Sequence, residues 1–264
     1  MNGLAPRPLT RWIIGGVVGL LFALPLVSTL LFTLQDGDGY TFARWAGLFD
    51  PAKAAVLTPI WTGLGNSLLL ALVTVLIVLL VLAPTMILVS LRFPALRRSF
   101  ELLVLLPITI PAIVLVVGLA PIYQQIGRTL GTGAWTLAFA YGITVLPFAY
   151  RSIQASIDAV DLRTLSEAAR SLGAGWFTVV TRVLAPNLRP GLLAASLISV
   201  AVVLGEFTIA SLLNRQVLQT GLVVVNKIDA YASAMFTLMA LAFAFALLLV
   251  IGRAGRSQPG KNRS

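Results

Sequence analysis

Residues 161–190 read DLRTLSEAARSLGAGWFTVVTRVLAPNLRP, a polar stretch with a helical pattern that lies between segments apolar enough for a bilayer. Apolar side chains recur at helical spacing in its first half, and Asp161 is an acceptable N-cap. Gly173 is expected to end that first helix. The predicted apolar face consists of Leu165, Ala168, Ala169 and Leu172. A polar helix between membrane segments indicates a surface that binds a partner outside the membrane.

A second short amphipathic stretch follows the glycine, and Pro186 and Pro190 are expected to close it before the next apolar run. Its apolar residues are Trp176, Phe177, Val180, Val183 and Leu184. The whole segment therefore predicts a helix, a sharp turn and a second helix with Trp176 and Phe177 as an exposed aromatic pair. An amphipathic helix that lies on the membrane surface is the alternative reading.

The composition indicates an integral membrane protein. Hydrophobic residues make up 58% of the 264 residues and charged residues 11%, against about 45–50% and about 25% in soluble domains. Six apolar runs are long enough to span a hydrocarbon core as helices. They are Trp12–Leu34, Asn66–Leu91, Leu102–Ala120, Ala134–Tyr150, Gly191–Leu213 and Ser233–Gly252. The fold class predicted from the sequence is an all-α membrane protein with six transmembrane helices.

The distribution of positive charge predicts the orientation. With both termini in the cytoplasm, five of the 19 lysines and arginines fall outside, which leaves fourteen inside, as the positive-inside rule requires. The five outside are Arg44, Lys53, Arg128, Arg215 and Lys227. This orientation puts residues 161–190 in the cytoplasm. Topology and attraction to anionic lipid account for the net charge of +10, so no nucleic-acid partner is expected.

The absence of two residue types excludes several kinds of catalytic and metal-binding site. The chain has no cysteine and no histidine, which excludes disulfides, thiolate metal sites and Ser-His or Cys-His catalysis. A membrane enzyme is therefore disfavoured, and no metal site is expected. No phosphate-binding loop of the G-x-x-x-x-G-K-[ST] type is present, so any ATP and Mg²⁺ are expected on another chain and no cofactor on this one. A secondary transporter or channel should carry more ionisable residues inside its spans than this chain does.

The spacing within residues 161–190 resembles a family motif. Glu167, Ala168 and Ala169, followed after three residues by Gly173 and later by Val183 and Pro186, resemble the EAA loop of permease subunits of binding-protein-dependent type I ABC importers. Val183 stands where isoleucine is usual and Ala185 where leucine is usual. We refer to residues 161–190 as the EAA segment. The resemblance implies a coupling helix that docks into a groove on a cytoplasmic ATPase. The residues it assigns to this contact are Glu167, Ala168, Ala169, Gly173, Trp176, Phe177 and Pro186.

The resemblance covers about residues 60–252 and implies the type I ABC importer permease fold in a bacterial plasma (inner) membrane, with several membrane passes. It implies two ATPase subunits, a second permease subunit and an extracytoplasmic substrate-binding protein as partners, with membrane lipid around them. A heterodimer of permeases is expected in preference to a homodimer. No linker divides the chain, so residues 1–264 are expected to form a single transmembrane domain, and a disordered basic tail is expected at residues 253–264.

Glu206 is the one ionisable residue that the sequence places well inside a span. A helix that enters from the cytoplasm near Gly191 would carry it past the midplane. A carboxylate there is costly in lipid, which makes it a candidate for the substrate pathway, with Thr208 and Ser211 nearby. A structural role, in which Glu206 accepts hydrogen bonds from a neighbouring helix, is the alternative. The stretch Gly205-Glu206-Phe207 resembles one found in several importer permeases, both anion and cation carriers.

The overall pattern most resembles the spermidine/putrescine branch of these importers, which implies a polyamine-like small polar solute. The third span, with Pro107 and Pro111, resembles polyamine-type permeases as well. Aminoethylphosphonate, thiamine and ferric-ion importers are similar in pattern and remain alternatives.

Prolines within the runs, which also include Pro84 and Pro147, are expected to kink the helices. A short interfacial helix is expected around Phe42–Phe49 in the outside loop.

Overall fold

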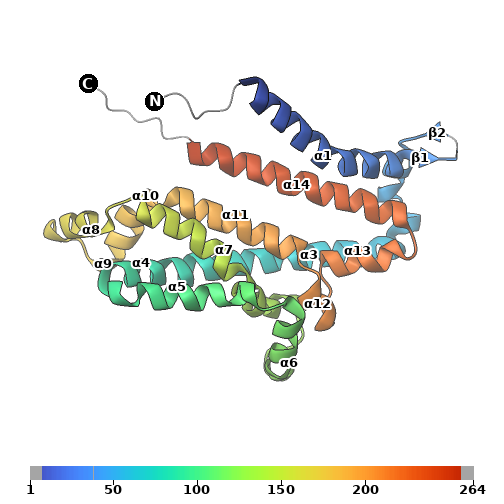
Figure 1. The fold of residues 1–264 in the computed structure, drawn as a ribbon. Helices are drawn as coiled ribbons and strands as arrows, with labels where there is room; N and C mark the ends of the chain where they lie inside the picture. Colours follow the sequence, from blue (N-terminus) through green and yellow to red (C-terminus); the bar gives the residue numbers. More distant parts are fainter. Residues whose placement is uncertain (1–7, 38, 257–264) are drawn as a thin grey trace. The chain divides into compact units, whose positions relative to one another are not determined.

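A computed structural model describes residues 8–37 and 39–256, and almost all of them are helical (Figure 1). The first part of the chain contains α1 (Pro8–Leu34), β1 (Gln35–Asp36), β2 (Gly39–Tyr40), α2 (Ala43–Ala46), α3 (Ala54–Ile77), α4 (Ala83–Arg92) and α5 (Arg97–Leu105). The second part contains α6 (Ala112–Thr129), α7 (Ala138–Asp158), α8 (Leu162–Ser171), α9 (Trp176–Thr178), α10 (Ala185–Asn187), α11 (Arg189–Gly205), α12 (Thr208–Leu212), α13 (Leu218–Asn226) and α14 (Ala230–Arg256). Short 3₁₀ segments and two π-helical segments, Val78–Leu82 and Val179–Leu184, join some of these helices.

Three of the four prolines that the sequence singles out lie at irregular places in these helices: Pro84, Pro107 and Pro111. Pro84 is the second residue after the π-helical segment Val78–Leu82, and the missing amide hydrogen of proline interrupts the regular ladder of hydrogen bonds there. Pro107 and Pro111 flank a sharp break between the 3₁₀ segment Leu106–Thr109 and α6. Pro147 lies inside α7, which continues through it.

The described residues form two compact units, residues 8–58 with 222–243 and residues 59–221 with 244–256. In the first unit, β1 and β2 form a two-residue antiparallel hairpin. Tyr231 stacks on Phe32 with ring centroids 4.7 Å apart, and the Arg44 guanidinium lies 3.9 Å from the Tyr231 ring centroid. The short helix predicted around Phe42–Phe49 is confirmed as α2 and the following 3₁₀ turn, Gly47–Phe49, and its place at the membrane interface stays a prediction.

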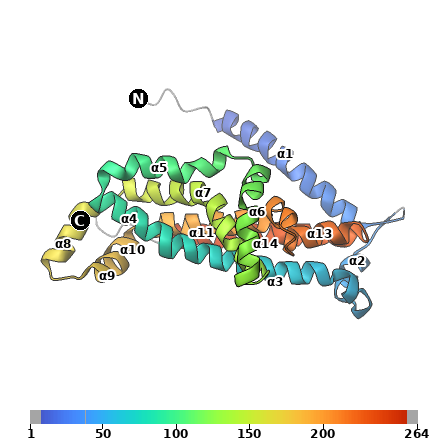
Figure 2. The same ribbon diagram turned by 90° about the horizontal axis from the view of Figure 1, so that it is seen from below.

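The second unit is built around α7 and α11, which form its most extensive helix pair. Two buried clusters lie along α7. One contains Tyr150, Ile153 and Leu184 on the side of α8, and the other contains Tyr141, Leu137 and Ile209 on the side of α6 and α12. Figures 1 and 2 show α8 beyond one end of α7 and α6 at the other. The EAA segment and the α6–α12 region therefore lie at opposite ends of α7.

Three helical stretches within the described residues are long and apolar enough to cross a membrane. They are Leu9–Leu34, Pro51–Arg92 and Ala230–Leu247. Two bent helix pairs would bring the number of spans to five: Pro94–Thr109 with Ala112–Thr129, at 104°, and Trp176–Asn187 with Arg189–Gly205, at 80°. A helical membrane protein is thus confirmed, whereas the count of six and the orientation of the termini stay predictions.

Three predicted spans differ from the structure. The run Ala134–Tyr150 begins with a 3₁₀ turn, Ala134–Leu137, its helix α7 continues to Asp158, and α7 is not among the candidate spans within the described residues. The run Leu102–Ala120 is not one straight helix, because Pro107 and Pro111 break it and its two halves bend by 104°. The run Gly191–Leu213 is also interrupted, since α11 ends at Gly205 and α12 begins only at Thr208. At the C-terminal end, α14 continues to Arg256, so the first four residues of the expected disordered tail are helical. Residues 257–264 of that tail lie outside the described residues.

Candidate functional site

The first helix of the EAA segment begins as the sequence predicts. Asp161 is the N-cap of α8 and accepts hydrogen bonds from the Thr164 amide at 3.1 Å and from the Thr164 hydroxyl at 2.6 Å. These hydrogen bonds favour the ionised carboxylate, so they hold the pKa of Asp161 below its usual value. The cap satisfies an amide that would otherwise have no partner in the first turn.

Gly173 ends α8, also as predicted, and it does so through its backbone conformation. Its φ is +84°, a left-handed value that glycine adopts without a steric penalty. The Gly173 amide donates to the Arg170 carbonyl at 2.9 Å and the Ala174 amide to the Ala169 carbonyl at 3.1 Å. This is the Schellman pattern of helix ends. It turns the chain from α8 toward Trp176.

The second half of the EAA segment is one helical stretch from Trp176 to Asn187 that includes the π-helical residues 179–184. The exposed aromatic pair is confirmed, with Trp176 exposed by 41% and Phe177 by 80%. Pro186 lies near the end of this stretch and is exposed, and Pro190 begins α11 after the 80° bend. The segment thus leaves two large aromatic rings uncovered by the chain itself.

The predicted apolar face of α8 is confirmed for two of its four residues. Ala169 is buried and Leu165 half-buried, whereas Ala168 is exposed and Leu172 is 89% exposed. The helix packs on the π-helical residues 179–184 through a stripe that continues Ala169 back to Leu162, so Ala168 and Leu172 turn away. Glu167 is exposed and accepts a hydrogen bond of 2.9 Å from Arg163 one turn earlier, which raises the pKa of Arg163. Leu172, Trp176 and Phe177 therefore form an exposed apolar surface at the turn.

Glu206 does not lie within a helix, contrary to the sequence interpretation. It follows the last residue of α11 in extended conformation, and its carboxylate reaches forward to the start of α12. The carboxylate oxygens Oε1 and Oε2 accept the Ile209 amide at 2.9 and 3.1 Å, and Oε2 also accepts the Tyr141 hydroxyl of α7 at 2.8 Å. These bonds match the structural alternative for Glu206. Thr208 is half-buried and Ser211 exposed, both on α12.

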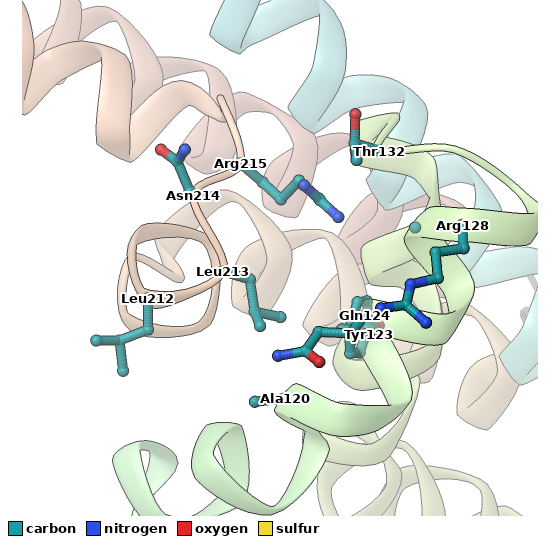
Figure 3. Close-up of a pocket in the computed structure, with 10 residues that line it drawn as sticks. Ala120, Tyr123, Gln124, Arg128, Thr132, Leu212, Leu213, Asn214 and Arg215 are labelled. Carbon is teal, nitrogen blue, oxygen red and sulfur yellow. The ribbon is translucent and has the colours of Figure 1, made fainter.

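Sequence reasoning missed a pocket of about 460 Å³ between α6 and the end of α12 (Figure 3). It is lined by Ala120, Tyr123, Gln124, Gly127, Arg128, Thr132, Leu212, Leu213, Asn214 and Arg215, and we call it the arginine pocket. The sequence indicates Arg128 and Arg215 only as charges that fix the orientation. They are 87 positions apart, and no local pattern indicates that the fold brings them together. Among the described residues no group of His, Cys, Asp or Glu is placed to hold a metal ion.

The helical spans define a multi-pass membrane protein, and the polar EAA segment leaves exposed apolar side chains at one end of α7. Residues 87–255 match the family described as binding-protein-dependent transport system inner membrane component, and the chain belongs to that family. It is therefore an inner-membrane permease subunit of an ABC importer, a transport component and not an enzyme. The matched residues include the EAA segment and the arginine pocket.

Three relatives are similar over different lengths. The chain is 29% identical over 211 residues to the spermidine/putrescine transport system permease protein PotB of Haemophilus influenzae, which covers 71% of this chain and 70% of that protein. It is 31% identical over 216 residues to the molybdenum transport system permease protein ModB of Mycobacterium bovis, 76% of each chain. It is 29% identical over 101 residues to the spermidine/putrescine transport system permease protein PotC of Escherichia coli, 38% of this chain and 37% of that protein.

Proposed function

We propose that this chain moves a small polar solute across the inner membrane after an extracytoplasmic binding protein delivers it, and that a cytoplasmic ATPase drives the movement. The exposed surface of Leu172, Trp176 and Phe177 carries the proposal, because such an apolar patch on a polar segment marks a contact with another protein. The EAA segment would dock on the ATPase through this surface and through Glu167, Ala168, Ala169, Gly173 and Pro186.

The proposed assembly contains two ATPase subunits, a second and different permease subunit and the binding protein. ATP and Mg²⁺ would bind to the ATPase subunits and no cofactor to this chain. The permease pair would alternate between a state open to the cytoplasm and a state open to the outside. ATP on the cytoplasmic side and the loaded binding protein on the other side would shift the balance between these states.

We propose six membrane spans, both termini in the cytoplasm and a single permease domain. Five spans would come from the three long helices and the two bent pairs. The sixth would be α7, whose 21 residues at about 1.5 Å each extend about 31 Å, close to the thickness of a hydrocarbon core. In this arrangement α7 connects the arginine pocket outside with the EAA segment inside.

For the solute, a polyamine-like cation is the first candidate, because relatives named for spermidine and putrescine transport are among the similar proteins. Aminoethylphosphonate, thiamine and ferric ion stay further candidates. An oxyanion is the second candidate, and two observations favour it: the similarity to a molybdenum permease and the two arginines of the pocket. The break between α11 and α12, with Glu206, Thr208 and Ser211, is the part of the pathway we propose in this chain.

Transport in liposomes tests this proposal. The purified complex, with binding protein outside and ATP inside, should accumulate a labelled solute, whereas this chain alone should neither hydrolyse ATP nor transport. Labelled spermidine and labelled phosphonate, each challenged with an excess of the other, would separate the two solute classes. Flux driven by a proton or sodium gradient through this chain alone would instead identify a secondary transporter or channel and overturn the proposal.

A further inference from the structure

The arginine pocket collects positive charge with no negative charge to balance it. Two of its ten lining residues are arginines, none is acidic, and Gln124, Thr132 and Asn214 add neutral polar groups. The Arg215 guanidinium lies over α6, since Nη2 is 3.9 Å from the position that a Cβ on Gly127 would occupy. Figure 3 shows the side chains of Arg215 and Arg128 entering from opposite sides of the pocket.

Neither arginine has an acidic partner among the described residues, and the described acidic side chains are engaged elsewhere. Those in the second unit pair with Arg97, Arg151 and Arg163, cap α8, or bind Tyr141 and Ile209. The Arg215 Nε is buried and has no hydrogen-bond partner in the described part of the chain. The hydroxyl of Tyr123 is also occupied, because it donates to the Thr136 carbonyl and accepts the Ala140 amide. A buried guanidinium donor with no acceptor is a costly arrangement.

The fold holds Arg215 in this place through both ends of α12. Glu206 caps the start of the helix, as described above. At its end, Asn214 adopts a left-handed φ of +52°, and the Arg215 amide donates to the Ala210 carbonyl at 2.8 Å. The next residues are anchored on α3, where Asn66 donates to the Gln216 carbonyl at 2.8 Å and the Ser67 hydroxyl accepts the Leu218 amide at 2.9 Å. The position of Arg215 is thus specified by four separate contacts.

We propose that the arginine pocket is a binding site for a small oxyanion, of the phosphate, phosphonate or carboxylate class. A planar guanidinium matches the oxygens of such a group, and the charge-assisted hydrogen bonds it forms are stronger than neutral ones. The anion would accept the free Arg215 Nε–H and relieve the repulsion between the two cations. The neutral amide of Gln124, which lies between the two arginines in Figure 3, can donate a further hydrogen bond to it.

This inference rests on the proposed importer function, since it makes the bound oxyanion part of the solute. The pocket lies at the end of α7 away from the EAA segment, which in the proposed orientation is where the binding protein releases its load. An anion in this pocket favours the second of the two solute classes proposed above, the oxyanion, over the polyamine-like cation, so the solute would be anionic or zwitterionic. Binding can be measured without transport, so the two proposals can fail separately.

Calorimetric titration of the purified, delipidated complex tests the site, with inorganic phosphate, methylphosphonate and spermidine as the added compounds. Phosphate or methylphosphonate should bind, and spermidine should not compete. The variants Arg128→Gln and Arg215→Gln should each weaken anion binding roughly 10-fold or more, because each removes a charged donor. Lys227→Gln is the matched control, since it removes an exposed positive charge on the same predicted side and should leave binding unchanged.

The inference would be overturned if neither anion binds the wild-type complex, if the arginine variants bind as the wild type does, or if spermidine binds and displaces the anion. A phospholipid that copurifies with the wild type and is lost from both arginine variants, with no binding of free phosphate, would assign the pocket to a lipid headgroup and also overturn it. Copurification of the partner subunits with each variant would show that the variants assemble. If Arg215→Gln fails to assemble, the exposed Arg128→Gln still tests the loss of one charge, and Arg215→Lys tests the loss of the planar guanidinium. ATP-driven spermidine uptake with no anion binding would remove this inference and leave the importer function standing.

Discussion

At the scale of single residues, Gly173 shows how one backbone angle shapes the EAA segment. No atom lies within 4 Å of a Cβ placed on Gly173, so only its φ of +84° opposes a larger residue. Gly173→Ala should therefore cost about 1–2 kcal/mol at the end of α8. Hydrogen exchange of the Ala174 amide should become about 5–30-fold faster. Gly175→Ala is the control, because Gly175 has equal space and a φ of −71°, and its exchange should match the wild type.

Glu206 provides a second test at this scale, since its carboxylate binds α7 and α12 at once. Glu206→Gln keeps one acceptor oxygen, so we expect assembly, pocket geometry and uptake close to those of the wild type. Glu206→Ala leaves the Ile209 amide and Tyr141 hydroxyl without this acceptor, which should cost about 1–3 kcal/mol and weaken anion binding through misplacement of Arg215. The measurement is anion binding and solute uptake by complexes that carry each variant. A large loss of uptake in Glu206→Gln alone would show that the charge itself acts on a cationic solute.

Sequence patterns predicted residues well where local chemistry decides the structure. The cap at Asp161 and the turn at Gly173 depend on neighbours within a few positions, and both are confirmed. The predicted face of α8 failed at Ala168 and Leu172, because the direction in which a short helix packs depends on its tertiary partner, the π-helical residues 179–184. Arg128 and Arg215 could not be joined from the sequence, since α6 and α12 meet only in the folded chain.

At the scale of helices, α8 should depend on pH through its cap. The pKa of Asp161 is lowered in the folded protein, so its stabilisation is present above the unfolded pKa of about 3.9 and is lost as pH falls through the lower folded value. Exchange of the Thr164 amide should thus be protected to the same degree, after correction for intrinsic rates, from neutral pH to about pH 5 and lose protection only below about pH 4. Asp161→Asn should remove this acid step. A step of equal size in Asp161→Asn would assign it to another group.

The pairing of α7 and α11 gives a prediction about packing. Gly191 is buried in this contact, and a Cβ there would meet the Ser156 side chain and the Ser152 carbonyl, the latter at 2.7 Å. Gly191→Ala should destabilise the protein by about 1–3 kcal/mol because the helices must separate. The shift of the thermal unfolding midpoint in detergent measures this. Gly118→Ala in α6, where no atom lies within 4 Å, is the control and should shift the midpoint little; equal shifts would show that α7 and α11 do not pack this closely.

Helices were predicted more reliably than their continuity. The apolar runs found α1, α3 and α14, because length and hydropathy alone identify a span. They did not reveal that the runs Leu102–Ala120 and Gly191–Leu213 are broken. The prolines indicated the first break, and the second comes at Glu206, whose carboxylate caps a new helix instead of continuing the old one.

At the scale of the whole molecule, the central claim is that the EAA segment faces the cytoplasm and contacts an ATPase. The chain contains no cysteine, so a single introduced cysteine reports its own position. Leu172 is 89% exposed at the turn of the EAA segment, and Leu130 is 52% exposed at the end of α6 near the arginine pocket. Leu172→Cys and Leu130→Cys therefore mark the two ends of α7.

Labelling of these two variants with a membrane-impermeant maleimide, followed by cross-linking in the assembled complex, tests the claim most directly. In intact cells the reagent should label Leu130→Cys and spare Leu172→Cys, and in inside-out vesicles the pattern should reverse. A short bifunctional maleimide should cross-link Leu172→Cys to a cysteine introduced in the ATPase groove. Labelling of Leu172→Cys from outside intact cells, or no cross-link in a complex that hydrolyses ATP, would contradict the account.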